Sequence, residues 1–100
     1  MIERHWTGLA RPESAEAYVD HLQTETFPAL GAIAGFAGAC ILRREVARGV
    51  EFLVITRWES LAAIHAFAGA DAEVAVVPGN VRAMMLEFDA RARHYVSVSQ

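Results

Sequence analysis

Two apolar runs joined by a short loop constrain the fold of this chain more than any other feature. The runs are ACILRREV at residues 39–46 and VEFLVITRW at residues 50–58, and the loop between them contains Gly49. Runs rich in β-branched and aromatic residues on either side of a short glycine-containing loop predict a β-hairpin. The fold must therefore contain an antiparallel sheet.

The second strand of this hairpin is apolar on both faces. Side chains alternate along a strand, so one face carries Phe52, Val54, Thr56 and Trp58, and the other carries Leu53 and Ile55. A sheet with one face in water would alternate apolar and polar residues instead. Helices of the same chain can cover only one face, so we expect a second copy to cover the other across a two-fold axis.

The segment before the hairpin predicts a strand followed by a helix. Residues 2–10 carry strand-forming side chains, and Pro12 with Glu13 is typical of a helix start. Apolar residues then recur at steps of three and four from Glu13 to about Thr24. We expect Pro28 to bound this amphipathic helix.

The segment after the hairpin predicts a short helix, an irregular linker, a third helical stretch and a last strand. Ser60 can cap the short helix, and Gly69 follows where it ends. The third stretch has apolar residues at Val81, Met84, Met85 and Phe88, and residues 92–99 form the strand. The resulting β-α-β-β-α-β order is the ferredoxin-like α+β arrangement, with helices on one face of a four-stranded antiparallel sheet.

Composition limits the number of domains and the kinds of partner. One hundred residues form a single domain, and a hydrophobic content of 54 % exceeds the roughly 45–50 % of ordinary domains, as expected if one face meets a partner chain. The net charge is −3 without a basic run, which disfavours nucleic acid and anionic membrane surfaces. The charged start MIERHWTG and the lack of a long apolar run predict a cytoplasmic protein.

Three segments resemble the antibiotic biosynthesis monooxygenase family. They are the IxRxW pattern at residues 2–6, RWESLAAIHAFAGADAEVAVVP at residues 57–78 and FDARARHYVSV at residues 88–98. The resemblance implies a dimeric α+β barrel. It also implies oxygenation of electron-rich polycyclic phenols without metal or flavin, so we expect no cofactor.

Another branch of that family binds and degrades haem. The tryptophan and histidine that shape its site would fall here on Phe67 and Val77, and its first-strand asparagine is missing from IERHWTG. The resemblance therefore disfavours haem degradation.

His94 is the expected general base, because a histidine with an ordinary pKa near 6.5 can accept a proton at neutral pH. Arg4 and Trp6 share one face of the first strand, so a guanidinium and an indole N–H could donate to one oxygen of a ligand. The ferredoxin-like order places the first and last strands together. A structural histidine, a surface arginine and a core tryptophan remain alternatives.

Further aromatic and sulfur-containing residues are expected to hold the substrate, with core or interface packing as the alternative. These residues are Trp58, Phe67 and Met84. Surface or boundary positions are expected for His21 and His65, and capping or solvation for Asp71 and Glu73. No spacing in the chain matches a metal-binding motif.

Three functions fit this pattern. The first is a cofactor-independent monooxygenase acting on a small aromatic or polyketide-like molecule. The second is a non-catalytic, dimeric small-molecule-binding or stress-response protein, which would need no base. The third is an isomerase or lyase, which would use the base without consuming oxygen. No nucleophile elbow, phosphate-binding loop, CxxC or HExxH motif supports other chemistry.

Overall fold

A computed structural model describes residues 1–99 of the chain. Its strands are β1 (Ile2–Ala10), β2 (Phe36–Val46), β3 (Gly49–Trp58), β4 (Met85–Phe88) and β5 (Arg93–Val96). Its α-helices are α1 (Ala15–His21), α2 (Phe27–Gly31), α3 (Leu61–Ala68) and α4 (Gly79–Met84). A 3₁₀ turn at Pro12–Ser14 precedes α1, and a π-helical turn at Leu22–Thr26 joins α1 to α2.

All five strands belong to one antiparallel sheet, in the order β2-β3-β1-β4, with β5 also paired to β1. The predicted hairpin is β2 with β3, and the ferredoxin-like α+β class is confirmed. The fourth position of the sheet is shared by two short strands. Strand β4 pairs with the end of β1, and β5 pairs with its start, where Arg4 lies opposite His94.

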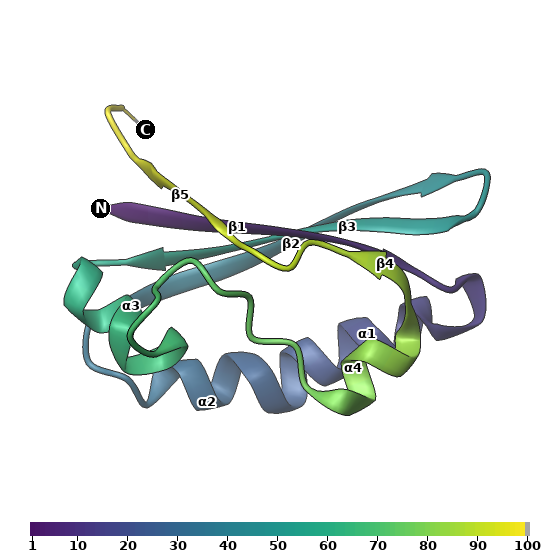
Figure 1. Ribbon diagram of the computed structural model, residues 1–100, viewed down its shortest axis with the longest axis horizontal. Coiled ribbons are helices and arrows are strands. Elements are labelled where there is room, and N and C mark those ends of the chain that lie inside the picture. Colours follow the sequence, from purple (N-terminus) through teal and green to yellow (C-terminus); the bar gives the residue numbers. More distant parts are fainter. Residues whose placement is uncertain (100) are drawn as a thin grey trace.

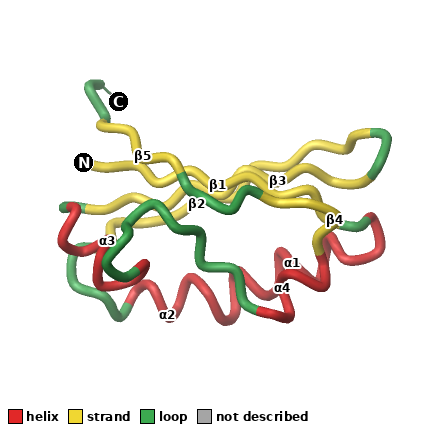
Figure 2. The backbone as a smooth tube through the Cα atoms, viewed as in Figure 1, coloured by secondary structure: helices red, strands yellow, loops and turns green. Residues whose placement is uncertain are grey.

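The helices lie on one face of the sheet, and the other face carries none (Figures 1 and 2). The covered face of β3 is fully buried at Phe52 and Trp58. The bare face is half-buried at Leu53 and Ile55. Within residues 1–99, no helix has the length and apolar character needed to cross a membrane.

The first helical segment is longer than its sequence predicts, because it runs through Pro28 to Gly31. Proline lacks a backbone N–H and its ring crowds the preceding turn, so it normally ends or kinks a helix. Here a π turn comes directly before it, and the Phe27 N–H donates to the Leu22 carbonyl five residues back. The chain thus stays helical where the sequence predicted an end.

The third predicted helical stretch is wrong in its second half. Helix α4 ends at Met84, and Met85 begins strand β4, which pairs with Ala10 of β1. A short apolar run fits a buried strand as well as a helix. Pairing with the free edge of β1 decides between them.

Two groups of buried side chains fill the space between sheet and helices. The larger group includes Tyr18, Leu22, Phe52, Val54 and Met85. The smaller one contains Leu30, Trp58, Ala63 and Ile64. Phe27 packs against both, so the two groups form a continuous apolar layer.

Candidate active site

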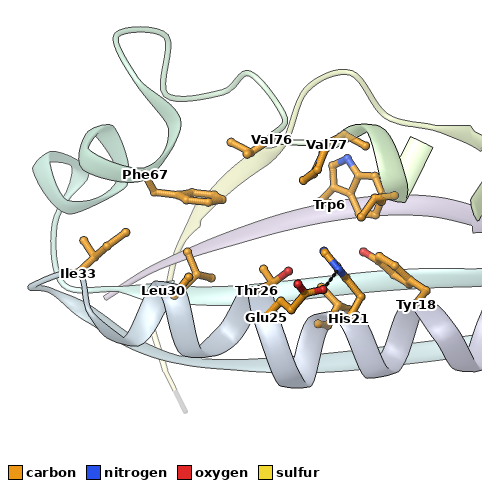
Figure 3. A pocket seen from close by; sticks show the side chains of 14 residues that line it. Trp6, Tyr18, His21, Glu25, Thr26, Leu30, Ile33, Phe67, Val76 and Val77 are labelled. Atoms are coloured by element: carbon orange, nitrogen blue, oxygen red, sulfur yellow. Dashed lines mark hydrogen bonds and ion pairs between the residues drawn. The ribbon is translucent and has the colours of Figure 1, made fainter. Parts of the chain in front are cut away.

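A cavity of about 300 Å³ lies between the first helical segment and the linker that connects α3 to α4 (Figure 3). Its lining is mostly apolar and includes Trp6, Leu22, Leu30, Phe67, Val76 and Val81. A smaller hollow of about 70 Å³ shares several of these walls and reaches inward to Arg4 and Thr56. An apolar cavity with few polar groups is typical of a site for a small organic ligand.

The π turn supplies the polar side of this cavity. Leu22, Glu25 and Thr26 belong to the turn, His21 immediately precedes it, and all four line the cavity. Such turns are rare in proteins and occur frequently at functional sites. The local backbone therefore places ionisable side chains beside an otherwise apolar space.

His21 and Glu25 form a hydrogen-bonded pair at the cavity (Figure 3). The His21 Nδ1 lies 2.8 Å from the Glu25 Oε2, and the His21 side chain is only 11 % exposed. An ionised carboxylate can only accept a hydrogen bond, so Nδ1 carries the proton and donates it. The Asn80 side chain also approaches Nδ1, at 3.4 Å. In the neutral imidazole, Nε2 is then the unprotonated nitrogen, which can accept a hydrogen bond or a proton.

The Tyr18 hydroxyl is the second polar group of the cavity. The Tyr18 ring packs edge-on against Phe52, with 4.9 Å between ring centroids. Every fully buried side-chain nitrogen or oxygen in residues 1–99 has a hydrogen-bond partner. The Tyr18 hydroxyl has none among these residues, so it opens onto the cavity that it lines. Burial raises the pKa of this phenol, which keeps its proton available for donation.

Trp6 forms part of the cavity wall through its ring, while its indole N–H is already bonded. The Trp6 Nε1 donates to the Asp89 carbonyl at 2.8 Å, and Figure 3 shows this nitrogen on the side of the ring away from His21. The ring lies over Gly8, where an added Cβ would come within 2.5 Å of it. Glycine at this position therefore makes room for the tryptophan.

Arg4 is buried behind the cavity, with 5 % of its surface exposed. Its Nη1 donates to the Ala72 carbonyl, and its Nη2 donates to the Val74 carbonyl at 2.8 Å. Burial lowers the pKa of Arg4, and the charge of Glu73 opposes this shift. An arginine remains charged even so. Arg4 therefore fastens the linker that forms one wall of the cavity.

His94 bonds to Arg4 and does not line the cavity. Its Nε2 lies 2.8 Å from the Arg4 Nη1. A guanidinium only donates, so this Nε2 accepts. Burial, followed by the neighbouring Arg4 charge, lowers the pKa of His94. The structure thus brings His94 and Arg4 together, but their polar atoms face each other and the linker.

The three predicted substrate-binding residues lie in different surroundings. Phe67 lines both the cavity and the inner hollow, and the Arg4 guanidinium lies 5.6 Å from the centre of its ring. Trp58 is fully buried and stacks on Phe67, with 5.9 Å between ring centroids. Met84 packs against the larger core group. Trp58 therefore supports the wall that Phe67 provides.

An ion-pair network holds the linker from outside. Arg91 donates to both Asp71 oxygens at 3.1 Å and to Glu73 at 3.3 Å. The hydrogen bonds from Arg91 lower the pKa of the Asp71 carboxyl. These side chains are about half exposed, so solvent weakens the network. Among residues 1–99, no group of three or more metal-ligating side chains converges.

The sequence predicted a surface or boundary position for His21, with no role in binding, and it did not single out Glu25 or Tyr18 as site residues. The i, i+4 spacing of histidine and glutamate on a helix, with tyrosine three residues earlier, was the available signal. That spacing alone also fits an exposed ion pair. Only the linker lying over this helix makes it a cavity wall.

The antibiotic biosynthesis monooxygenase family model matches residues 7–77, which is most of the chain. The chain belongs to this family. Membership supports a general monooxygenase-like function. The matched region includes the β2–β3 hairpin and most of the linker over the cavity.

Solved structures of other proteins share the fold at low sequence identity. A Bacillus cereus protein assigned as an antibiotic biosynthesis monooxygenase has 20 % identity and a TM-score of 0.69, with 100 % of this chain and 94 % of the other covered. An arginine-to-serine mutant of MhuD, with two manganese protoporphyrin IX bound per active site, has 18 % identity and a TM-score of 0.63, with 100 % and 97 % covered. No curated protein matches the chain in sequence.

Proposed function

We propose that this protein is a monooxygenase that needs no cofactor and oxidises a small, electron-rich aromatic or polyketide-like molecule in the cavity. The observation that carries the proposal is the cavity itself, an apolar space in which few polar groups meet a ligand. Its volume of about 300 Å³ is at the lower end of the range for small-molecule sites, which favours a compact, fused-ring substrate.

The proposed reaction balances with dioxygen alone. A ring methylene beside a carbonyl loses a proton, and the resulting carbanion reacts with dioxygen to form a peroxide. Loss of water from the protonated peroxide leaves a second carbonyl, so one oxygen atom enters the product and the other leaves as water. The protein must bind the ring, accept the proton and stabilise the negative charge.

Arg4, Trp6 and His94 support this reaction as positioning residues. Arg4 holds the linker, His94 accepts a hydrogen bond from Arg4, and Trp6 bounds the cavity with its ring. Phe67 contributes its aromatic side chain to the cavity wall. The sequence suggested His94 as the base and Arg4 with Trp6 as the site for a negatively charged substrate oxygen. In that arrangement, these groups would have to give up their present hydrogen bonds and bind the ligand instead.

Oxygen uptake tests the proposal. Electron-rich phenols and keto tautomers with one to three fused rings should be screened with an oxygen electrode and with ¹⁸O-labelled dioxygen. We expect one dioxygen consumed and one labelled atom incorporated per product molecule. Saturable binding that raises the melting temperature without oxygen consumption would instead support the binding-protein alternative. Absence of both uptake and binding would overturn the assignment of this cavity.

We also propose that the bare face of the sheet joins two copies of the chain. Leu42 is 50 % exposed there and lies opposite Leu53, beside the half-buried Ile55. Neighbouring apolar side chains that remain in water favour an interface. Packing of one sheet on another across a two-fold axis would cover them.

Leu42→Glu tests the interface, because a charge on that face should separate the subunits without entering the protomer core. Leu61→Glu is the matched control, since Leu61 is 48 % exposed but lies on α3. Light scattering should give about twice the chain mass of 10.9 kDa for the wild type and the control, and about one chain mass for Leu42→Glu. A monomeric wild type would contradict the dimer.

A further inference from the structure

We propose that His21, oriented by Glu25, is the catalytic base of the cavity and that Tyr18 donates a hydrogen bond to the substrate oxygen on which negative charge develops. The matching substrates are enolisable fused-ring ketones and their phenol tautomers. This inference rests on the proposed function, because it assigns the proton transfer to named groups in the same cavity.

The bonding of the four histidines singles out His21. His94 uses its Nε2 to accept from Arg4, His5 bonds to Glu3 on the other face of the sheet, and His65 bonds to the Gly69 carbonyl outside the cavity. Only His21 lines the cavity. Its Nδ1 is fixed by Glu25, so Nε2 is the nitrogen left for a ligand.

Tyr18 and His21 are three residues apart on one helix, which brings their side chains onto neighbouring parts of one face. Cβ atoms at this spacing lie about 5–6 Å apart, a span that one fused-ring ligand can bridge. Figure 3 shows both side chains on the cavity side of the helix, below Trp6. An acidic C–H and a carbonyl oxygen of the same molecule can therefore meet Nε2 and the phenol together.

The proton balance closes within this pair. The substrate C–H proton moves to His21 Nε2, and the bonding electrons remain on the substrate as an enolate held by the Tyr18 O–H. Glu25 stabilises the imidazolium through the hydrogen bond to Nδ1. After dioxygen adds, the imidazolium protonates the peroxide, and water leaves. The Glu25 side chain is 67 % exposed, so the pair lies at the cavity mouth, in contact with solvent.

Hydrogen exchange separates proton transfer from oxygen chemistry. Fused-ring ketones such as 1-indanone, first shown to bind saturably, are incubated with the protein in D₂O without dioxygen, and deuterium at the carbon beside the carbonyl is followed by NMR. We expect the wild type to accelerate exchange. His21→Gln should slow it by about 10²-fold or more, and Tyr18→Phe by about 10²-fold. Glu25→Gln should have a smaller effect.

His65→Gln is the matched control, because His65 also makes a 2.8 Å hydrogen bond through Nδ1 but does not line the cavity. This variant should exchange substrate at the wild-type rate. Added imidazole should partly restore exchange to His21→Ala, which a merely structural role of His21 would not allow.

Two results would overturn the inference. One is wild-type exchange by His21→Gln, and the other is a wild type that binds the ketones without accelerating their exchange. The two assays can also disagree. If exchange depends on His21 but the separate oxygen-electrode assay shows no uptake, His21 is upheld as the base and the oxygenase proposal is overturned, in favour of an isomerase or lyase.

Discussion

His21 and His94 belong to two different polar clusters near the cavity. The two histidines differ in the groups that their ring nitrogens contact. In the first cluster, His21 bonds to Glu25 through one nitrogen and presents the other to the cavity. In the second, His94 and the buried Arg4 bond to each other, and Arg4 also bonds to the linker. Ionisable groups whose donors and acceptors are all bonded within the protein stabilise the structure. A group with a free nitrogen at a cavity can carry chemistry.

Arg4→Met should give the largest effect on stability, because it leaves two linker carbonyls and His94 without their donor. We expect the free energy of unfolding to fall by about 2 kcal/mol or more and the melting temperature by about 8 °C or more. Arg43→Met is the control, since Arg43 makes an exposed ion pair with Glu16. Denaturant titration of both variants measures the difference. Equal losses would contradict a structural role specific to the Arg4 cluster.

Phe67→Leu should affect both clusters, because Phe67 lines the cavity and also lies under the Arg4 guanidinium. Loss of the ring removes a cation–π contact of about 1 kcal/mol and one aromatic wall. We expect a moderate drop in unfolding free energy together with weaker binding of aromatic ketones. Calorimetry of unfolding and of binding measures the two effects. A change in only one of them would show that Phe67 does not link the clusters.

His94→Gln should change the pH dependence of stability. The pKa of folded His94 is lowered from 6.5, so the unfolded chain binds the proton more readily. The stabilisation from neutral His94 is therefore fully present above about pH 6.5 and is lost as the pH falls through the lowered pKa. The side-chain oxygen of a glutamine at this position can accept the hydrogen bond from Arg4, but the amide does not titrate in this pH range. The unfolding free energy of the variant should fall less steeply with acid, and parallel curves would contradict the linkage.

His21→Gln should have the smallest effect on stability, within about 0.5 kcal/mol, because the Glu25 carboxylate is largely exposed. Thermal unfolding measures this, together with the exchange assay on the same sample. A loss as large as that of Arg4→Met would place His21 with the structural residues and remove the contrast between the clusters.

The sequence was sufficient for four of the five strands of the sheet and missed β4, whose residues were predicted as helix. The hairpin has a local signature, and strand alternation correctly sorted the buried residues of β3, such as Phe52 and Trp58. The expected adjacency of the first and last strands is confirmed by the pairing of β1 with β5, and the structure adds the register that sets Arg4 opposite His94. These features follow from short-range patterns and from the order of the elements.

The polar lining of the cavity could not be derived in the same way. His21 lies among polar neighbours in the sequence, and only the distant linker, which contributes Val76 and Val77, makes its surroundings a cavity. Similarly, no feature of the sequence near Arg4 predicted that its guanidinium would donate to the Ala72 and Val74 carbonyls. Long-range contacts decide which candidate groups keep free hydrogen-bonding atoms.

The π turn at Leu22–Thr26 also governs the rotational phase of the helix. Tyr18 and Leu30, both buried against the sheet, are twelve residues apart, and at about 100° per residue a regular α-helix would separate them by about 120°. One residue taken up by the wide turn reduces this separation to about 20°. A chain lacking the exposed Gln23 would therefore keep the same buried stripe without the wide turn, with a kink remaining at Pro28. Such a deletion should leave the sheet and core assembled while removing the wide turn that contributes Glu25 and Thr26 to the cavity lining.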